Sequence, residues 1–255
     1  MKFRPCIDIH NGSVKQIIGG SLSDAGDVAL ENFISGYDAG FYARLYRQYK
    51  LYGGHIIMLN PVSSPYYEAD VAQALNALRE FPGGLQVGGG ITCDNALFFL
   101  NHGASHIIVT SYVFNNGKVD FNRLKELSEL AGKKRLVIDL SCRKKDNAYY
   151  IVTNRWQKFT NLVLTHETLD KFAPYCAEFL IHAVDVEGMA SGIEIPLVCL
   201  LADWNGSNIT YAGGIASYDD IESLKSISKS RLDFTVGSSL DLFGGNISFK
   251  SLTNL

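Results

Sequence analysis

Short apolar runs alternate along this chain with segments of helical periodicity. Eight runs have the length of strands and are bounded by glycine, proline or polar residues; they cover residues 3–9, 55–59, 85–87, 106–109, 135–140, 178–183, 209–212 and 232–236. Between these runs apolar residues recur every three or four positions, as at Leu124, Leu127 and Leu130. Side chains at this spacing share one face of a helix. The pattern therefore predicts eight buried strands, each followed by a helix.

The helical segments and two interruptions complete the predicted order of elements. The clearest helical segments lie near residues 42–52, 69–78, 96–100, 124–130, 168–174, 195–201 and 219–227. Asp94 is a candidate N-cap for the third of them. After the first strand, the glycine-rich segment from Gly19 to Gly36 predicts a long loop with a functional task. The polar residues 141–147, followed by the apolar residues 149–152, predict an inserted ribbon.

The second half of the chain repeats features of the first half in the same order. The repeated features are the acids Asp8 and Asp139 at the ends of two strands, the glycines at 88–90 and 213–214, and the turns Thr110-Ser111 and Gly237-Ser238. Each feature recurs about half the chain length later, with only small insertions between them. We therefore interpret the chain as two similar halves, roughly 1–131 and 132–255.

Eight strand–helix units over 255 residues are the number that a (β/α)8 TIM barrel requires. A doubly wound open sheet is the alternative, but two matching four-strand halves close more naturally into one ring. No stretch rich in proline, serine or like charges divides the chain. The predicted fold class is therefore α/β, with one (β/α)8 barrel over residues 1–255 and a half-barrel internal repeat.

Composition and charge exclude several classes of partner. The net charge is −3, and the lysines and arginines form no basic stripe, so we do not expect nucleic acid as a partner. No apolar run approaches the ~20 residues that a membrane span needs. Asp8 would interrupt the apolar region of a signal peptide. We therefore expect a cytoplasmic protein that makes no membrane contact and is a monomer.

The five cysteines carry no pattern of a metal or disulfide site. They are far apart, and they form no Cys-x-x-Cys motif and no pairing with histidines; they are Cys6, Cys93, Cys142, Cys176 and Cys199. We expect free, buried thiols and neither a metal nor a cofactor.

Asp8 and Asp139 are the candidate catalytic residues. A carboxylate directly after an apolar strand is costly unless it faces a partner, a substrate or water. In a barrel the carboxyl ends of all strands meet at one face, and the first and fifth strands lie opposite each other. A single acid at a strand end more often caps the next element or pairs with a lysine. The recurrence at matching positions instead favours an acid and a base on opposite sides of a substrate.

The repeated glycines predict two phosphate sites. Glycines that precede a helix can present backbone N–H groups to an anion, and the helix N-terminus adds partial positive charge. One glycine cluster alone is more often a tight turn, but two clusters on opposite sides of the rim indicate a substrate with a phosphate at each end. The expected phosphate-binding residues are Gly89, Gly90, Thr110, Ser111, Gly213, Gly214, Gly237 and Ser238.

These motifs together resemble a known family. The segments that carry this resemblance are 6–9, 86–91, 137–139, 211–214 and 236–238, together with 179–188 and 238–245. The chain resembles the phosphoribosylformimino-aminoimidazole-carboxamide ribotide (ProFAR) isomerases of histidine biosynthesis, in their fungal-like form. The resemblance covers nearly the whole chain. It implies an Amadori rearrangement of a bisphosphorylated aminoaldose to an aminoketose, without metal or redox cofactor.

The resemblance also implies roles for individual residues. Asp139 would be the general acid that protonates the ribose ring oxygen, and Asp8 the base that removes the C2 proton of the Schiff base. We therefore expect a raised pKa of Asp139 when substrate is bound. The residues with expected weaker substrate contacts are Trp156, Arg143, His182 and Gly20. His182 and Thr92 depart from the pattern of bacterial relatives, which have a hydroxyl side chain and an arginine there.

Two other functions stay open on the sequence alone. The sister cyclase of the same pathway shares both acids and both phosphate sites, but it has an essential lysine where this chain has Gln16; Lys15 comes one position early. A barrel that binds phosphosugars without catalysis is the second alternative, and the presence of both acids argues against it.

Overall fold

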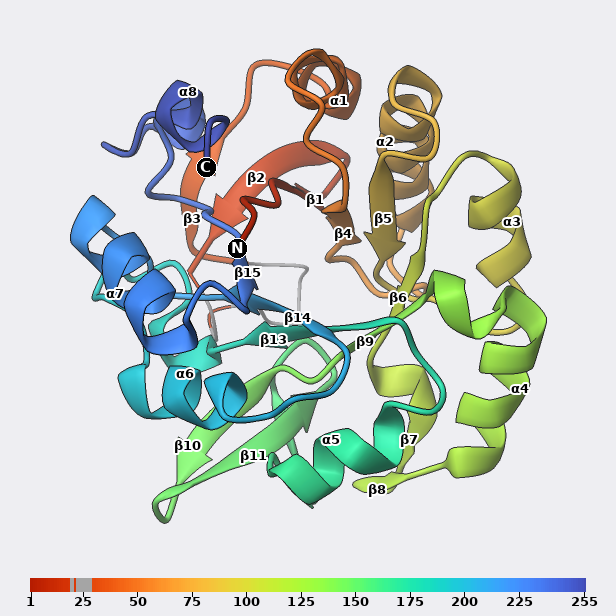
Figure 1. Cartoon of the computed structure of the whole chain (residues 1–255). Helices are drawn as coiled ribbons and strands as arrows, with labels where there is room; N and C mark the ends of the chain where they lie inside the picture. The colour runs from red at the N-terminus through yellow and green to blue at the C-terminus, as the bar shows by residue number, and fades with distance from the viewer. Residues whose placement is uncertain (19–20, 22–28) are drawn as a thin grey trace.

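A closed ring of eight parallel strands forms the centre of the computed structural model, which describes residues 1–18, 21 and 29–255 (Figure 1). In ring order the strands are β1 (Cys6–His10), β4 (Gly54–Met58), β5 (Leu85–Gly88), β6 (Ile107–Val109), β9 (Leu136–Asp139), β13 (Glu178–His182), β14 (Asn208–Ala212) and β15 (Asp233–Phe234). Each neighbouring pair is parallel. A parallel bridge between Phe3 and Phe234 closes the ring, and Arg4 N donates to Phe234 O at 2.8 Å.

A helix follows each strand of the ring, and Figure 1 shows the helices around the outside of the strands. The helices are α1 (Ala39–Gln48), α2 (Tyr67–Glu80), α3 (Ala96–Asn101), α4 (Phe121–Ala131), α5 (His166–Phe172), α6 (Ile195–Ala202), α7 (Tyr218–Ser228) and α8 (Phe249–Leu252). Short 3-10 helices cover Ser111–Val113, Lys133–Arg135, Val184–Val186 and Asp241–Phe243. This order confirms the predicted (β/α)8 barrel; the division into half-barrels stays a prediction.

The apolar spacing that predicts α4 matches its buried face only in part. Leu124 and Leu127 are buried but Leu130 is exposed, because a strict three-residue spacing drifts off a face that repeats every 3.6 residues. The side chain of Asp120 caps the first turn of α4. In α7 the side chains of Ser217 and Asp220 form a capping box. The predicted cap of α3 is wrong: its N-cap is Asn95, one residue after Asp94.

The expected long loop after the first strand is partly a sheet. β2 (Ser13–Ile17) pairs antiparallel with β1, and β3 (Glu31–Ile34) pairs antiparallel with β2. β1 accordingly continues past Asp8 to His10, because Ile9 and His10 pair with β2. The remainder of that loop, residues 19–20 and 22–28, lies outside the described residues.

The inserted ribbon is confirmed, and it has three strands. β10 (Cys142–Lys145), β11 (Ala148–Thr153) and β12 (Lys158–Val163) form an antiparallel sheet. A smaller hairpin joins β7 (Phe114–Asn115) to β8 (Lys118–Val119).

The inside of the barrel changes from charged to apolar to polar along its axis. At the amino ends of the strands, Arg4 bonds to Glu178 at 3.0 Å and to Asp233 at 2.7 Å. Above it lies an apolar cluster from β4, β6, β9, β13 and β14, made of Ile57, Ile108, Val137, Leu180 and Ala212. At the carboxyl ends, acids and histidines line a pocket. The barrel therefore has a packed floor beneath the site.

All five cysteines are free, as predicted, but they are not all buried. Cys6, Cys142 and Cys176 are buried, Cys93 is partly exposed and Cys199 is exposed on α6. None of the helices in the described residues is both long and apolar enough to span a bilayer.

Candidate active site

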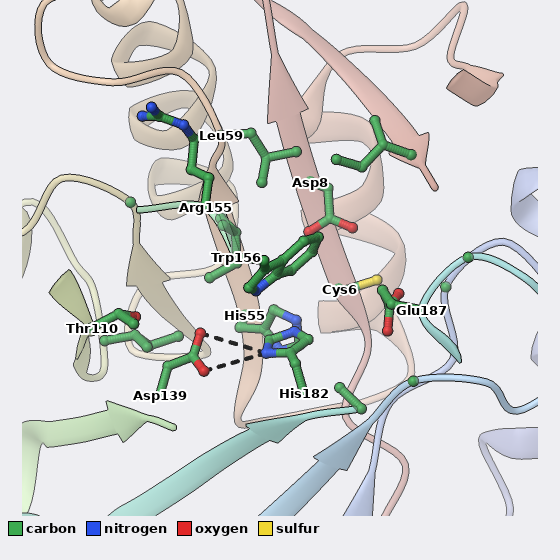
Figure 2. A pocket seen from close by; sticks show the side chains of 18 of the residues that line it. Cys6, Asp8, His55, Leu59, Thr110, Asp139, Arg155, Trp156, His182 and Glu187 are labelled. Carbon is green, nitrogen blue, oxygen red and sulfur yellow. Dashed lines mark hydrogen bonds and ion pairs between the residues drawn. The ribbon is translucent and has the colours of Figure 1, made fainter. Parts of the chain in front are cut away.

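One cavity of about 390 Å³ opens at the carboxyl ends of the ring strands. Asp8 on β1 and Asp139 on β9 both line it, and these strands lie four places apart in the ring of eight. Figure 2 shows the two carboxylates on opposite sides, with Trp156 and His182 between them. The cavity volume falls in the range of small-molecule sites. The symmetry argument from the sequence therefore places both acids correctly.

The carboxyl group of Asp8 has a pKa near neutral pH. Gln16 on β2 donates from Nε2 to Asp8 Oδ2 at 3.0 Å. Burial and the nearby Glu187 carboxylate raise the pKa of Asp8 to about 7, which outweighs the lowering by His182 and the Gln16 hydrogen bond. A carboxylate with this pKa is suited to accept a proton and to return it.

Asp139 differs from Asp8 because donors surround it. Its Oδ1 accepts from Ser141 N at 2.8 Å and from Ser141 Oγ at 2.6 Å. His182 Nδ1 lies 3.5 Å from Oδ1 and from Oδ2. Burial alone would raise the pKa of Asp139, but the charge of His182 and the hydrogen bonds hold it below its usual value. The raised pKa that the sequence predicts for Asp139 refers to the protein with substrate bound and stays a prediction; without substrate, the pKa of Asp8 is the raised one.

His182 ends β13 and faces the pocket beside a second histidine, His55 on β4. Burial lowers the pKa of His182, but the Asp139 carboxylate more than compensates and raises it to about 9. Burial and the charge of His182 lower the pKa of His55 to about 3. The two rings meet edge to face, with centroids 6.3 Å apart. The site therefore contains one charged and one neutral imidazole at pH 7.

Trp156 reaches the pocket from a strained turn of the ribbon. Asn154, Arg155 and Trp156 have φ angles of 52°, 53° and 67°, in the left-handed region that non-glycine residues rarely adopt. The indole Nε1 donates to Ser141 Oγ at 3.0 Å, and its ring lies 5.8 Å from the ring of His182. The indole lines the cavity, where a substrate heterocycle could stack on it.

The first predicted phosphate site contains Gly89, Gly90, Thr110 and Ser111, and all four line the cavity. Gly89 has a φ of 96° and packs so closely on Met58 O that a side chain would overlap this carbonyl. Ser111 Oγ accepts from Asn154 N at 2.9 Å, which holds the ribbon turn above this site.

The second predicted phosphate site repeats this arrangement. Gly213, Gly214, Gly237 and Ser238 line the cavity. Gly213 has a φ of 117°, and a Cβ there would lie 2.8 Å from Ala183 O at the end of the preceding strand. In both sites a glycine thus packs against the carboxyl end of the preceding parallel strand.

Backbone N–H groups are available at both sites. In the part of the chain that the structure describes, the N–H groups of Gly90, Gly214 and Ser238 donate no hydrogen bond. Gly90 and Gly214 have positive φ angles, and all three residues line the cavity, where such N–H groups are suited to bind an anion. The two sites flank the acids, as the sequence predicts.

Three other residues that the sequence analysis discusses as substrate contacts are not among the described residues that line the cavity. Arg143, on β10, is not among the described residues that line the cavity; its Nε donates to Asp185 Oδ1 at 2.8 Å. Thr92 lies in the turn before α3, where its N–H donates to Asn95. Gly20 lies outside the described residues.

Three possible metal ligands meet on the pocket floor, although the sequence predicts no metal site. Cys6, Asp8 and His55 each offer a ligand atom, and these atoms lie within 4.8 Å of one another. Gln16 Nε2, however, donates to Asp8 Oδ2 and also approaches Cys6 Sγ at 3.8 Å. Burial holds the pKa of the Cys6 thiol well above its usual value. A bridging N–H donor and a protonated thiol both disfavour a cation there.

Four residues of the site are missing from the sequence prediction: Gln16, His55, Ser141 and Glu187. The sequence contains only a weak signal for these four residues. Gln16 and His55 are polar residues within or beside apolar runs, and such residues are costly to bury without partners. Ser141 and Glu187 follow strands at ordinary loop positions.

Comparisons with known proteins agree with this geometry. The family model described as "Histidine biosynthesis protein" matches residues 2–247. The chain belongs to this family. It is 50% identical over 256 residues to a chloroplastic protein of Medicago truncatula, an alignment that covers 99% of this chain and 80% of the relative. That relative is named 1-(5-phosphoribosyl)-5-((5-phosphoribosylamino)methylideneamino) imidazole-4-carboxamide isomerase.

Fungal members of the family carry the same isomerase name. The Neurospora crassa protein is 45% identical over 247 residues, with 96% of this chain and 93% of the relative covered. The Saccharomyces cerevisiae protein is 45% identical over 253 residues, with 96% and 94% covered. The fungal-like resemblance expected from the motifs is therefore confirmed.

Proposed function

We propose that this chain is a ProFAR isomerase, which converts the aminoaldose ribotide into the aminoketose by an Amadori rearrangement. The single observation that carries the proposal is the placement of Asp8 and Asp139 on opposite sides of one cavity, between two glycine-rich anion sites. A bisphosphate held at both ends would keep its phosphoribosylamino group, which carries the reacting ribose, within reach of the two acids.

Asp8 has the properties required of the base. Its carboxylate lies across the pocket from Asp139, and its pKa near 7 allows it to remove the C2 proton and to return a proton to the substrate. Asp139 and the donors bound to it form the acid side, where the ring oxygen must receive a proton. Trp156 supplies an aromatic face for the imidazole carboxamide.

Lys15 argues against the sister cyclase. Its Nζ pairs with Glu31 at 2.5 Å, and it is not among the described residues that line the cavity. The position of the expected cyclase lysine is occupied by Gln16, which bonds to Asp8. The chain therefore offers no lysine at the place where that reaction would need one.

The cavity lies within one polypeptide, so we propose that the monomer is active. A cytoplasmic location is likewise a proposal from the sequence; the Medicago relative is named as chloroplastic.

Conversion of the purified ribotide tests the proposed function. The protein, without added ammonia or nucleotide, should convert the aminoaldose into the aminoketose. Chromatography that separates the two ribotides measures the conversion. A requirement for ammonia, with closure of a new imidazole ring, would identify the cyclase instead. Binding of the ribotide without conversion would identify a phosphosugar-binding protein.

A further inference from the structure

A chain of hydrogen bonds fixes where protons lie on the acid side of the pocket. The indole nitrogen of Trp156 can only donate, so Ser141 Oγ is the acceptor in their 3.0 Å bond. The hydroxyl hydrogen of Ser141 is then directed to Asp139 Oδ1 at 2.6 Å, and Ser141 N donates to the same oxygen at 2.8 Å. Asp139 Oδ1 is therefore an acceptor twice over, as expected of an ionised carboxylate.

His182 completes this chain from the opposite side. Its Nδ1 lies 3.5 Å from both oxygens of Asp139, so this nitrogen carries a hydrogen that points at the carboxylate. Within the described residues, Nε2 of His182 has no hydrogen-bond partner, and His182 lines the cavity. An imidazolium in this position keeps one N–H for the carboxylate and has a second for a ligand.

The charges around His182 favour the imidazolium. The titratable groups that act on it are Asp139 from β9, Asp8 from β1, Glu187 from the segment after β13 and His55 from β4. The three carboxyl groups raise the pKa of His182 against the lowering by burial, to about 9. His55, with its pKa near 3, stays neutral and does not compete for the proton. Arg155 also lines the cavity, from the ribbon turn.

We propose that His182 is a catalytic residue of the isomerisation put forward above, and that its imidazolium, held by Asp139, donates the proton that opens the ribose ring. Asp139 then acts as a positioning residue for the imidazolium rather than as the acid itself. The inference rests on the proposed function, and it reassigns the acid expected from the family resemblance.

The proton balance closes over one turnover. The Nε2–H bond of His182 breaks as an O–H bond forms on the ring oxygen; the C1–O bond breaks with its electron pair on that oxygen, and the amine lone pair forms the C1=N bond. Asp8 takes the C2 proton, the C2–H electrons form C1=C2, and the C1=N electron pair returns to nitrogen. The C2 hydroxyl then gives its proton to His182 as C2=O forms, and the C1=C2 electron pair takes the proton from Asp8 to form a C1–H bond. Both residues end in their starting states.

The pH dependence of two variants tests this assignment. For the wild type, kcat/KM should fall below about pH 7 as Asp8 is protonated, and above about pH 9 as His182 loses its proton. His182→Gln should lower kcat by roughly 10²- to 10⁴-fold, abolish the limb near pH 9 and leave KM nearly unchanged. The matched control His102→Gln, exposed at the end of α3, should keep both limbs.

Direct observation of the ring supplies a readout that is independent of activity. In ¹⁵N NMR, with the resonances assigned through His182→Gln, the His182 ring should remain doubly protonated up to about pH 9 in the wild type. In Asp139→Asn its titration should move down by at least about one pH unit, because the facing carboxylate is lost.

Each failure has its own meaning. If His182→Gln keeps the limb near pH 9, or if the ring is neutral at pH 7, this inference is wrong while the isomerase assignment stands. If the wild type converts no ribotide at all, the proposed function itself is wrong, and this inference falls with it.

Discussion

Replacement of Asp8 by asparagine should stabilise the fold while it removes the proposed base. The pKa of Asp8 is about 7 in the folded protein and near 3.8 in an unfolded chain. Since each pKa unit corresponds to about 1.4 kcal/mol, the ionised carboxylate costs up to roughly 4 kcal/mol of unfolding free energy above pH 7. Asp8 is partly exposed to the pocket, where water lowers this cost, so we expect about 2 kcal/mol.

The sign follows from proton binding. Between about pH 4 and pH 7 the folded protein binds more protons at Asp8 than the unfolded chain does, so stability contributed by this group falls as pH rises through the window. Asparagine has no such charge and still offers an oxygen to Gln16 Nε2. The advantage of Asp8→Asn should therefore be full at pH 8 and nearly absent at pH 4.

Urea unfolding at several pH values measures this difference. At pH 8 the variant should gain about 2 kcal/mol, or roughly 4–8 °C in Tm for a chain of this size. Asp203→Asn, at the exposed end of α6, is the matched control and should change stability by less than about 0.5 kcal/mol. A variant no more stable than the wild type at pH 8, or equally stabilised at pH 4 and pH 8, would refute the reasoning.

Three further substitutions test the surroundings of the acids. Gly213→Ala places a Cβ 2.8 Å from Ala183 O at a φ of 117°, so ribotide binding measured by calorimetry should weaken at least about tenfold; Gly36→Ala, with open space around it, should bind normally. Ser141→Ala removes a hydrogen bond to a charged group worth about 1.5–3 kcal/mol, so kcat should fall by roughly 10- to 100-fold and the Trp156 fluorescence should shift; unchanged kcat would contradict the bond's role. Arg143→Gln breaks a half-exposed ion pair with Asp185, so kcat/KM should stay within about twofold; a large rise in KM would restore Arg143 as a substrate contact.

The barrel could be predicted because most ring strands contain a run of consecutive apolar residues. Such a strand is covered by helices on one side and by the barrel interior on the other, so its residues do not alternate between apolar and polar. β2 (Ser13–Ile17) was not predicted because two of its five residues, Lys15 and Gln16, are polar. Their burial depends on partners far along the chain, such as Glu31 for Lys15.

The positions of the acids could be predicted from the repeat, but their proton affinities could not. Asp8 and Asp139 occupy matching strand positions, yet burial and then Glu187 raise the pKa of Asp8, whereas His182 lowers the pKa of Asp139 against the effect of burial. Both neighbours come from β13 or the segment after it, so only the closed ring brings them to the acids. The direction of each pKa shift therefore depends on which groups the folded ring places near the acid.

Paired substitution of the two acids tests the central claim most directly. Calorimetry with the ribotide, followed by single-turnover conversion, would compare Asp8→Asn and Asp139→Asn with the wild type. Both variants should bind the ribotide with nearly unchanged affinity and convert it at least about 100-fold more slowly. Conversion at the wild-type rate by either variant would contradict the claim that these two carboxylates serve one reaction across one pocket.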